Sequence, residues 1–468
     1  MPPGKLSKRS LPLSKSHLNP LMKHIFIILT ICLTQLGLAE KPNVVLILSD
    51  DQSWTDYGFT GHKIIKTPRI DKFASESLTY TRGYVTSPLC RPSLASIFTG
   101  LHTPVHGITG NDLLVEGLKG RSSRSAPKTA PFHEQIYAGF QKQANLARLL
   151  GDAGYLSLQT GKFWEGKPQR HGFSNAMTHA DPKKGGRHGD VGLKISRTGI
   201  APIESFLDEA KKEEKPFFIW HAPFLPHTPH NPPKKLYDKY LKLEPNKFIA
   251  RYYAMVEWFD QTCGELFDEL DSRGLGKNTI IVYVCDNGWI QSGDSGKYAP
   301  QSKQEPHEGG IRTPIMVKWP DKVPAVMDQK TLVSSIDIAP TILKACGLEV
   351  PKAMTGLDLR NTAALARRNV IFGYDGNHDM QDVNNTTSNC ESRYIVEGDW
   401  KLIDHINNTS FAKRYNGRYT GRPGNEAGKA ELYNLATDPH EKTNLADKHP
   451  EKITALRKSL DAWWKPGK

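Results

Sequence analysis

Residues 43–51 read N-V-V-L-I-L-S-D-D. The first seven are almost all apolar, which is typical of a strand buried on both faces of a parallel sheet. Residues 279–285 form a second such run, T-I-I-V-Y-V-C, followed by Asp286 and Asn287. In parallel α/β sheets, ligands lie beyond the carboxyl ends of the strands. The two runs therefore predict an α/β fold in which the polar residues that follow them share one sheet edge.

These polar residues form a predicted cation site. The first run ends in Asp50 and Asp51, and the second is followed by Asp286 and Asn287. Three carboxylates at one sheet edge repel one another unless a cation joins them. All the donors are oxygen atoms, which favours a hard ion such as Ca²⁺. The alternative for each aspartate alone is an ordinary residue at the end of a strand.

A cysteine stands directly before a helix signal in S-P-L-C-R-P-S-L-A-S-I-F-T-G, residues 87–100. Pro92 suits the first helical turn and Gly100 suits the end of a helix. We therefore predict that Cys90 lies at a helix N-terminus, where free N–H groups favour an anion and lower the pKa of a thiol. The alternative is a small buried residue at a turn.

Together these stretches resemble the sulfatase family, the formylglycine-dependent hydrolases of the alkaline-phosphatase-like superfamily. The family signature is C-x-P-S-R followed by T-G, and residues 90–94 read C-R-P-S-L with T-G at 99–100. Residues 303–314, K-Q-E-P-H-E-G-G-I-R-T-P, and residues 431–435, E-L-Y-N-L, also match family segments. The resemblance covers residues 41–464 in the family's order, which makes coincidence of single motifs a poor explanation.

The resemblance implies an alkaline-phosphatase-like sandwich. It has a large, mostly parallel central sheet flanked by helices, and a small C-terminal antiparallel sheet with a helix. The implied division is a signal peptide at residues 1–39, a catalytic domain at 40–368 and a C-terminal subdomain at 369–468. Apolar periodicity predicts helices over residues 141–152, 202–213, 248–270, 338–346 and 453–464.

The N-terminal segment has the pattern of a secretory signal. Residues 25–38 are mostly apolar, Lys23 precedes them, and Gly37-Leu38-Ala39 resembles a small-residue cleavage site. The run is too short to span a bilayer comfortably. We expect an exported protein, periplasmic or secreted, without stable membrane insertion of the mature chain. The alternative is an uncleaved membrane anchor.

The chain is basic, and its charge would either attract a polyanionic partner or serve only solubility. The chain has 468 residues and a formal net charge of +13. Removing residues 1–39 takes away five Lys and Arg and no Asp or Glu, which lowers the charge to +8. A positive field concentrates a polyanion such as a sulfated polymer, and no nucleic-acid fold signature is present. Export permits disulfides among Cys263, Cys285, Cys346 and Cys390, although their pairing cannot be deduced.

The resemblance also assigns catalytic roles. Lys162 follows a predicted strand in the position of the family's sulfate-binding lysine, and Lys303, five residues before Glu308, matches the second one. His227 lies in a P-H-T-P segment whose histidine is the family's general acid. Histidine suits this role because its pKa lies near working pH.

Two residues depart from the family pattern. Leu94 stands where the signature has the arginine that assists maturation and steadies the modified residue, and leucine cannot donate hydrogen bonds. Trp164 stands where the family has a histidine that contacts the sulfate together with the lysine, and tryptophan cannot accept a proton. His171 and His179 are the nearby candidates to replace it.

The resemblance finally implies a reaction. A sulfatase-maturation enzyme would oxidise Cys90 to formylglycine (3-oxoalanine), which joins Asp50, Asp51, Asp286 and Asn287 around Ca²⁺. The hydrated aldehyde attacks the sulfur of a sulfated carbohydrate or aryl sulfate, and its second hydroxyl later expels the sulfate. The departures at positions 94 and 164 leave two alternatives open. One is a secreted, catalytically impaired protein that binds sulfated polysaccharide, and the other is a phosphoesterase that uses unmodified Cys90.

The polar loop at residues 374–389 lies at the predicted domain border. Loops in such places often carry function. We expect His378 and Asp379 to contact the substrate there, although a loop of this composition is also commonly a solvated surface segment.

Overall fold

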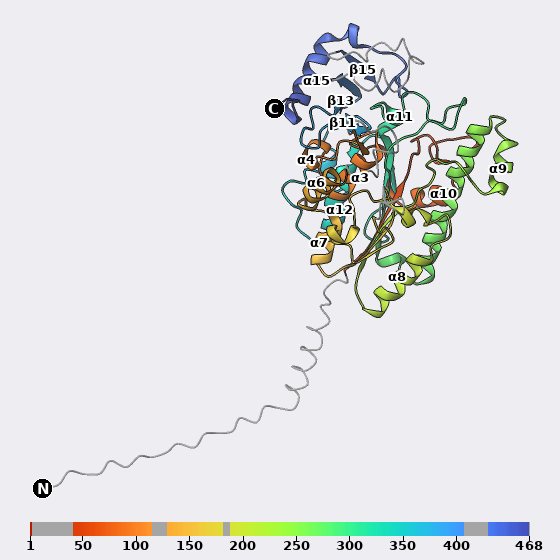
Figure 1. Cartoon of the computed structure of the whole chain (residues 1–468), viewed down its shortest axis with the longest axis vertical. Helices are drawn as coiled ribbons and strands as arrows, with labels where there is room; N and C mark the ends of the chain where they lie inside the picture. The colour runs from red at the N-terminus through yellow and green to blue at the C-terminus, as the bar shows by residue number, and fades with distance from the viewer. Residues whose placement is uncertain (2–40, 115–128, 181–187, 407–428, 468) are drawn as a thin grey trace. The chain divides into compact units, whose positions relative to one another are not determined.

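The computed structural model describes residues 1, 41–114, 129–180, 188–406 and 429–467 (Figure 1). Residues 42–468 form one compact unit. The predicted signal peptide lies outside the described residues apart from Met1, and the boundary at 368/369 stays a prediction. None of the helices in the described ranges combines the length and the apolar character needed to cross a membrane.

The central sheet is built around the strand that carries the first apolar run. Strand β1 (Asn43–Ser49) lies between β6 (Phe217–Ala222) and β7 (Thr279–Cys285) and is parallel to both. Every residue of these three strands is buried, which explains their nearly continuous apolar sequences. The strand formed by the second apolar run, β7, is therefore the immediate neighbour of the strand formed by the first, β1.

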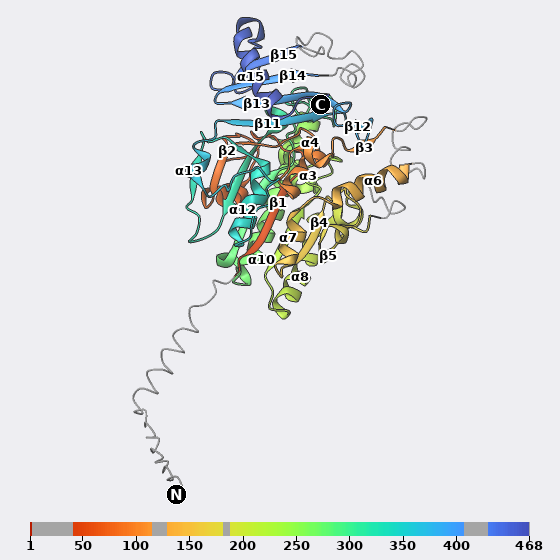
Figure 2. The same ribbon diagram turned by 90° about the vertical axis from the view of Figure 1, so that its left-hand side faces the viewer.

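Nine strands of the described chain make up this sheet, in the order β10-β2-β8-β7-β1-β6-β4-β5 with β9 paired to β2 (Figure 2). Strand β8 is antiparallel to β7 and β2 is antiparallel to β8, whereas the remaining pairs are parallel. The other strands are β2 (Leu78–Tyr84), β4 (Leu156–Gly161), β5 (Asn175–Ala176), β8 (Arg312–Lys318), β9 (Val326–Asp328) and β10 (Val333–Ser334).

Helices cover both faces of the sheet, as Figure 1 shows edge-on. One layer contains α3 (Cys90–Thr99), α7 (Leu146–Asp152) and α12 (Ile338–Ala345). The other contains α2 (Pro68–Ser75), α8 (Ala201–Lys212) and α10 (Lys247–Ser272). Alternate side chains of β1 divide between the two hydrophobic cores: Val44, Leu46 and Leu48 belong to the first, and Val45 and Ile47 to the second.

The C-terminal part adds a second sheet. Its four antiparallel strands are, in sheet order, β11 (Val370–Gly376), β13 (Cys390–Glu397), β14 (Trp400–His405) and β15 (Ala430–Asn434). Helix α15 (Pro450–Trp463) packs Leu456 and Leu460 against this sheet. The remaining elements of the described chain are α4 (Thr103–His106), β3 (Asp112–Leu113), α6 (Ala130–Gln141), η2 (Pro168–His171), η4 (Asp190–Lys194), α9 (Lys234–Leu241), η5 (Gly276–Asn278), α11 (Glu308–Ile311), η6 (Ser335–Asp337), α13 (Thr362–Leu365), β12 (Asp379–Met380) and η7 (Ala446–Lys448).

The predicted fold class is confirmed: a large, mostly parallel sheet between helices, with a small antiparallel C-terminal sheet. One predicted helix, over residues 141–152, has the wrong N-terminus. Gln141 ends α6, and α7 begins at Leu146 because the Asn145 side chain accepts a hydrogen bond from the Arg148 backbone and so caps a new helix. The five described cysteines are all free thiols, so the permitted disulfides do not form among them.

Candidate active site at the carboxyl edge of the central sheet

Strands β1 and β7 deliver the predicted carboxylates to one place. The two strands are parallel and in register, with Ser49 opposite Cys285, so the residues that follow them leave the sheet side by side. The Asp51 backbone N–H donates to Asp286 Oδ1 at 3.1 Å, and Asn287 Nδ2 donates to Asp51 Oδ1 at 2.8 Å. Asp51 has a φ of 64°, which a non-glycine residue rarely adopts and which often marks a functional site.

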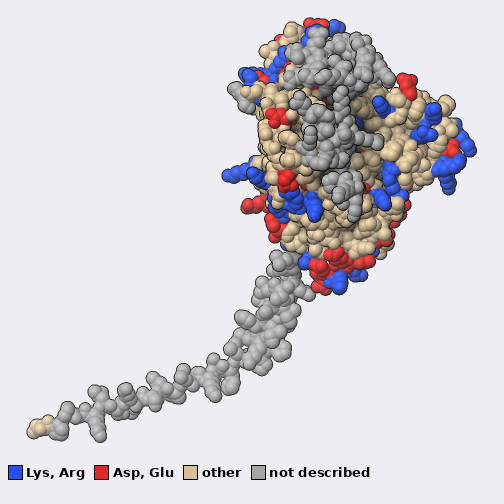
Figure 3. Space-filling model, viewed as in Figure 1, with Lys and Arg blue, Asp and Glu red and all other residues tan. Residues whose placement is uncertain are grey.

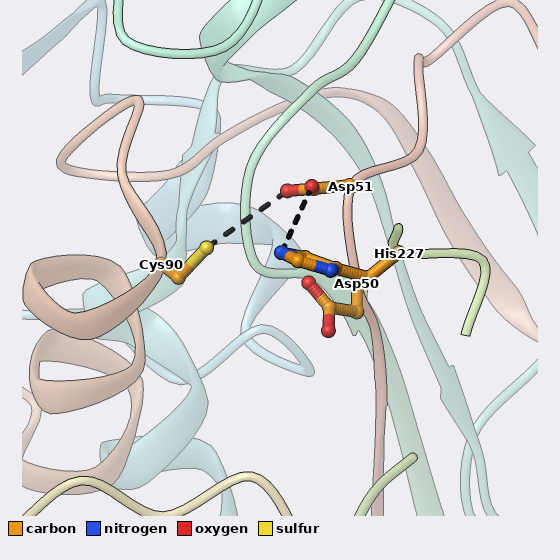
Figure 4. A group of neighbouring side chains, drawn as sticks. All are labelled: Asp50, Asp51, Cys90 and His227. Atoms are coloured by element: carbon orange, nitrogen blue, oxygen red, sulfur yellow. Dashed lines mark hydrogen bonds and ion pairs between the residues drawn. The ribbon is translucent and has the colours of Figure 1, made fainter. Parts of the chain in front are cut away.

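Helix α3 brings Cys90 to the same edge. Cys90 is the first residue of this helix, and Gly100 closes it in a left-handed conformation with a φ of 67°. The Cys90 Sγ atom lies 3.8 Å from Asp51 Oδ1 (Figure 4). The structure thus unites the cysteine of the signature with the aspartates of β1.

Two buried lysines face the aspartates. Lys162, at the end of β4, places Nζ 2.6 Å from Asp50 Oδ1 and 3.6 Å from Asp286 Oδ2. Lys303 places Nζ 2.6 Å from each Asp51 oxygen. Both lysines are nearly inaccessible to solvent. The two residues to which the resemblance assigns sulfate binding therefore lie inside the carboxylate cluster.

The cluster has oxygen atoms to spare for a cation. Asp50 Oδ2, Asp286 Oδ2 and Asn287 Oδ1 are buried and accept no hydrogen bond from any described group. A buried acceptor left in this state costs about 1–3 kcal/mol. Three such oxygens, from the ends of two adjacent strands, suit the all-oxygen coordination of Ca²⁺. These residues therefore fit the predicted ion.

A second combination of ligands also exists. One atom each of Asp50, Asp51, Cys90 and His227 lie within 4.8 Å of one another (Figure 4). This group lacks Asp286, which the resemblance includes, and adds His227. We favour the oxygen set because its unsatisfied atoms need a hard cation, whereas an imidazole nitrogen suits softer metals.

His227 faces the cluster with one ring nitrogen. Its Nε2 lies 3.4 Å from Asp51 Oδ2, and its Nδ1 bonds to the carbonyl oxygen of Thr228. A carbonyl only accepts hydrogen bonds, so Nδ1 carries a proton and Nε2 is the nitrogen free to exchange one with a ligand. Burial, together with the charges of Lys162 and Lys303, holds the pKa of His227 well below its usual value.

The predicted lowering of the Cys90 pKa is wrong. Burial raises the pKa of this thiol to about 12, and the nearby Asp286 and Asp51 add to the rise. Lys162 and Lys303 pull it down, but by less. The helix N-terminus was visible in the sequence, whereas the loss of solvent around the thiol was not. An unmodified Cys90 is thus a neutral thiol at pH 7.

Neither histidine proposed to replace the family's second histidine reaches the cluster. His171 Nε2 bonds to the Glu165 carbonyl, and its ring packs against Phe163 in the core. His179 is exposed. His188 was not identified from the sequence. Its ring lies 5.1 Å from that of Trp164, and its charge contributes to the lowered pKa of His227.

Phe224 connects these rings. Its centroid lies 5.2 Å from the His188 ring and 4.2 Å from the His227 ring. No motif surrounds His188 in the sequence, so only the folded structure identifies it.

His378 and Asp379 lie near the start of α3. The predicted loop over residues 374–389 is partly wrong, because β11 continues to Gly376 and Asp379 begins β12. His378 Nδ1 bonds to Asp379 Oδ1 at 2.6 Å. The His378 carbonyl accepts a 2.8 Å bond from the Asn111 backbone, and the Asn111 side chain accepts one from the Arg91 backbone. The side chains of His378 and Asp379 are 29% and 44% exposed. Both are therefore accessible beside the helix that carries Cys90, and their contact with substrate stays a prediction.

The chain is similar in sequence to named sulfatases and similar in fold to a solved structure. N-acetylgalactosamine-6-sulfatase from Canis lupus familiaris is 27% identical over 69% of this chain, which spans 66% of that protein, slightly under two thirds of its length. Arylsulfatase from Clostridium perfringens is 25% identical over 90% of this chain and 94% of its own. The solved structure of Ps i-CgsB in complex with k-i-k-neocarrahexaose matches the fold with a TM-score of 0.67 and 22% identity, covering 91% of this chain and 94% of that one.

Two family models match the chain. The model for the C-terminal part of N-sulphoglucosamine sulphohydrolase matches residues 296–418. The Sulfatase model matches residues 42–348, which is more than half of the chain and includes every predicted catalytic and metal-binding residue. The chain therefore belongs to the sulfatase family.

Proposed function

We propose that this protein is a sulfuric ester hydrolase that removes sulfate from a sulfated carbohydrate. One observation carries the proposal: Cys90, three aspartates and two lysines from five separate segments converge at one sheet edge, where three oxygens accept no hydrogen bond from the described groups. Such a site combines a bound cation, a reactive residue and positive charge for an anionic substrate.

Asp50, Asp51, Asp286 and Asn287 would hold Ca²⁺ in this proposal. When bound, the ion would supply positive charge that polarises a sulfate ester and lowers the pKa of an oxygen ligand. The Asp50, Asp286 and Asn287 oxygens that accept no hydrogen bond from the described groups support this assignment, because a cation would satisfy all three at once.

Cys90 would be converted to formylglycine by a maturation enzyme. The aldehyde, once hydrated, would offer one hydroxyl to attack the sulfur and a second whose deprotonation releases the sulfate. The position of Cys90 at the start of α3 supports an anionic ligand here, since helix N-termini present free backbone N–H groups.

The lysines and His227 would handle charge and protons. Lys162 and Lys303 already lie 2.6 Å from Asp50 and Asp51, so small rotations of their side chains would bring them to the sulfate oxygens. There they would neutralise the charge that builds during attack. His227 would act at Nε2, because its Nδ1 is committed to the Thr228 carbonyl. The negative charge of a bound sulfate ester would raise the pKa of the ring, so that Nε2 takes up the proton that it passes to the departing alcohol.

A relative, a similar solved structure and two accessible side chains support a carbohydrate substrate. The dog relative is named for sulfated N-acetylgalactosamine, and the Ps i-CgsB structure holds a carrageenan-type oligosaccharide. His378 and Asp379 offer accessible polar groups near α3. On the face drawn in Figure 3, described Lys and Arg side chains are interspersed with Asp and Glu. Such a face would attract a polyanion only where positive side chains lie together, and not over its whole area.

The test is expression with a sulfatase-maturation enzyme, followed by two measurements. The peptide that carries Cys90 should lose about 18 Da as its thiol becomes an aldehyde. The matured protein should release inorganic sulfate from a panel of 4-nitrophenyl sulfate, N-acetylgalactosamine 6-sulfate and carrageenan oligosaccharides. Cys90→Ala is the matched control and should release none.

Two alternative functions have distinct outcomes in this test. An intact thiol with no sulfate release, but with binding of sulfated polysaccharide, would support the non-catalytic protein, which the changes at Leu94 and Trp164 favour. Hydrolysis of 4-nitrophenyl phosphate by the unmodified chain would support the phosphoesterase. The raised pKa of Cys90 argues against this second alternative, because a neutral thiol is a poor nucleophile.

A further inference from the structure

Arg91, the residue after Cys90, makes a buried two-point ion pair with Glu165. Its Nε and Nη2 atoms each lie 2.7 Å from a different Glu165 oxygen. The two side chains are 2% and 5% exposed. This bidentate arrangement is the strongest and most directional form of an arginine–carboxylate contact.

The pair joins the two segments that carry Cys90 and Lys162. Glu165 follows Lys162 by three residues, and its carbonyl also accepts a hydrogen bond from His171. Arg91 is tied to a third segment as well, because its backbone N–H donates to Asn111 Oδ1 at 2.9 Å. Movement of α3 relative to the Lys162 segment would therefore break both bonds of the ion pair.

Leu94 lies beside this pair rather than opposite it. Arg91 and Leu94 are three residues apart on α3, the spacing that puts two side chains on neighbouring parts of a helix surface. Both line the same pocket with Lys162, Trp164 and Glu165. The family signature has its arginine at position 94, so this chain carries a guanidinium one turn earlier on the same side of the helix.

We infer that Arg91 and Glu165 are positioning residues that fix Cys90 relative to Lys162, in place of the arginine that the signature has at position 94. Arg91 acts through Glu165 and makes no contact with the reacting groups in the described structure. This inference rests on the proposed sulfatase function. It also predicts that an arginine at position 94 and one at position 91 compete for the single carboxylate of Glu165.

The test compares Glu165→Gln and Arg91→Leu with a swap, Arg91→Leu/Leu94→Arg, in the full matured chain. Displacing a reacting group by about 1 Å costs about 100-fold in rate, so both single variants should lose about 10- to 100-fold in kcat with a smaller change in KM. The swap should regain most of that loss, because the guanidinium introduced by Leu94→Arg would reach Glu165 from the same helix. A swap that folds but stays as slow as Arg91→Leu would overturn the inference.

Asp404→Asn is the matched control for the loss of a buried arginine partner. Asp404 accepts two bonds from Arg393, at 3.1 and 2.9 Å, and both side chains are 5% exposed. This pair lies in the C-terminal sheet. Asp404→Asn should lower the melting temperature, although by less than Glu165→Gln because Arg393 keeps its 2.6 Å bond to Asp461, and it should leave kcat near the wild-type value.

A second readout does not require sulfatase activity. In the chain expressed without a maturation enzyme, Cys90 is 1% exposed and should resist iodoacetamide. Glu165→Gln should alkylate at Cys90 at least about tenfold faster, since a freed helix end opens locally, while buried Cys263 stays protected. Equal alkylation of Cys90 in wild type and Glu165→Gln would refute the positioning role. A wild type that releases no sulfate would instead refute the proposed function, and alkylation would still decide the inference.

Discussion

The molecule contains two buried clusters of charge that differ in how their carboxylates are satisfied. The first is the edge cluster already described, with Asp50, Asp51, Asp286, Lys162 and Lys303. The second, here named the interface cluster, joins the segment after Lys303 to the C-terminal sheet. It consists of His307, Glu308, Lys401, His405, Glu431 and Glu441.

Every carboxylate of the interface cluster faces a cationic side chain closely. Lys401, fully buried, lies 3.2 Å from Glu308 and 2.7 Å from Glu441. Glu431 lies 3.1 Å from His307 and 2.9 Å from His405. In the edge cluster, by contrast, the Lys162 ammonium remains 3.6 Å from Asp286, and three oxygens accept no hydrogen bond from the described groups. Among the carboxylate oxygens of the interface cluster only Glu441 Oε1 accepts none from the described groups, and Lys401 Nζ lies 2.7 Å from it.

This difference separates a structural cluster from a cluster prepared for a ligand. Buried ion pairs whose members satisfy one another hold segments together and need nothing further. A cluster with spare acceptors carries a cost that only an added cation removes. Burial of charge alone therefore does not identify an active site, whereas several unfilled oxygen acceptors at one point support a cation site.

The largest expected effect tests the role of the spare acceptors. Asp286→Asn should lower kcat/KM about 1000-fold, because the cation would lose a charged ligand and the site its electrostatic stabilisation. Treatment of the wild type with EDTA should have the same effect, and added Ca²⁺ should reverse it. Glu431→Gln is the matched change in the interface cluster and should keep kcat/KM within a few-fold. Full activity of Asp286→Asn would remove the basis of the comparison.

The lysines of the two clusters should differ in their effect on stability. Lys401→Met leaves Glu308 and Glu441 without their shared partner and should cost about 3–5 kcal/mol in the free energy of unfolding. Lys303→Met should cost clearly less in saturating Ca²⁺, because the ion would compensate Asp51. Urea unfolding of both variants, with and without Ca²⁺, measures the difference. If both variants lost the same free energy of unfolding in saturating Ca²⁺, the edge cluster would also be purely structural.

The histidines of the two clusters should differ in their effect on catalysis. His227→Gln should lower kcat about 100-fold on a sugar sulfate, whose alcohol needs a proton to depart. The loss should be smaller on 4-nitrophenyl sulfate, because nitrophenolate leaves without protonation. His307→Gln serves as the control. Identical losses on the two substrates would exclude His227 as the acid.

The smallest expected effect concerns pH and the interface cluster. The charges of Glu431, Glu441 and Glu305, acting against burial, raise the pKa of His307 above its usual value. A raised pKa contributes stability that is present in full below about pH 6.5, the usual value, and is lost as pH rises through the folded value. The difference in unfolding free energy between wild type and His307→Gln should therefore be about 1 kcal/mol larger at pH 5.5 than at pH 8.5. A constant difference would contradict the His307–Glu431 ion pair.

Much of the edge cluster could be predicted because it follows directly from two apolar runs. Parallel strands that are adjacent and in register must release Asp50, Asp51, Asp286 and Asn287 at one edge. Adjacency itself was not visible in the sequence, since 235 residues separate Asp51 from Asp286. The resemblance to a known family supplied that step.

Other features depend on burial and on contacts between residues far apart in the sequence, which a local sequence pattern does not reveal. The Cys90 pKa was predicted with the wrong sign because desolvation outweighs the helix terminus and the lysines. Arg91 and Glu165 are 74 residues apart, and no local pattern in the sequence pairs them. His188 lies among glycine and basic residues that predict only a loop, yet the fold sets it against Trp164.

Strand β1 has a mechanical consequence for the site. It hydrogen-bonds to neighbours on both edges, and its alternate side chains enter both hydrophobic cores. The segment that holds Asp50 and Asp51 is thus anchored in four directions and cannot loosen without disrupting the whole unit. The amide protons of this segment should exchange with solvent only through global unfolding, so the edge proposed to bind the cation and the substrate shares the rigidity of the entire fold.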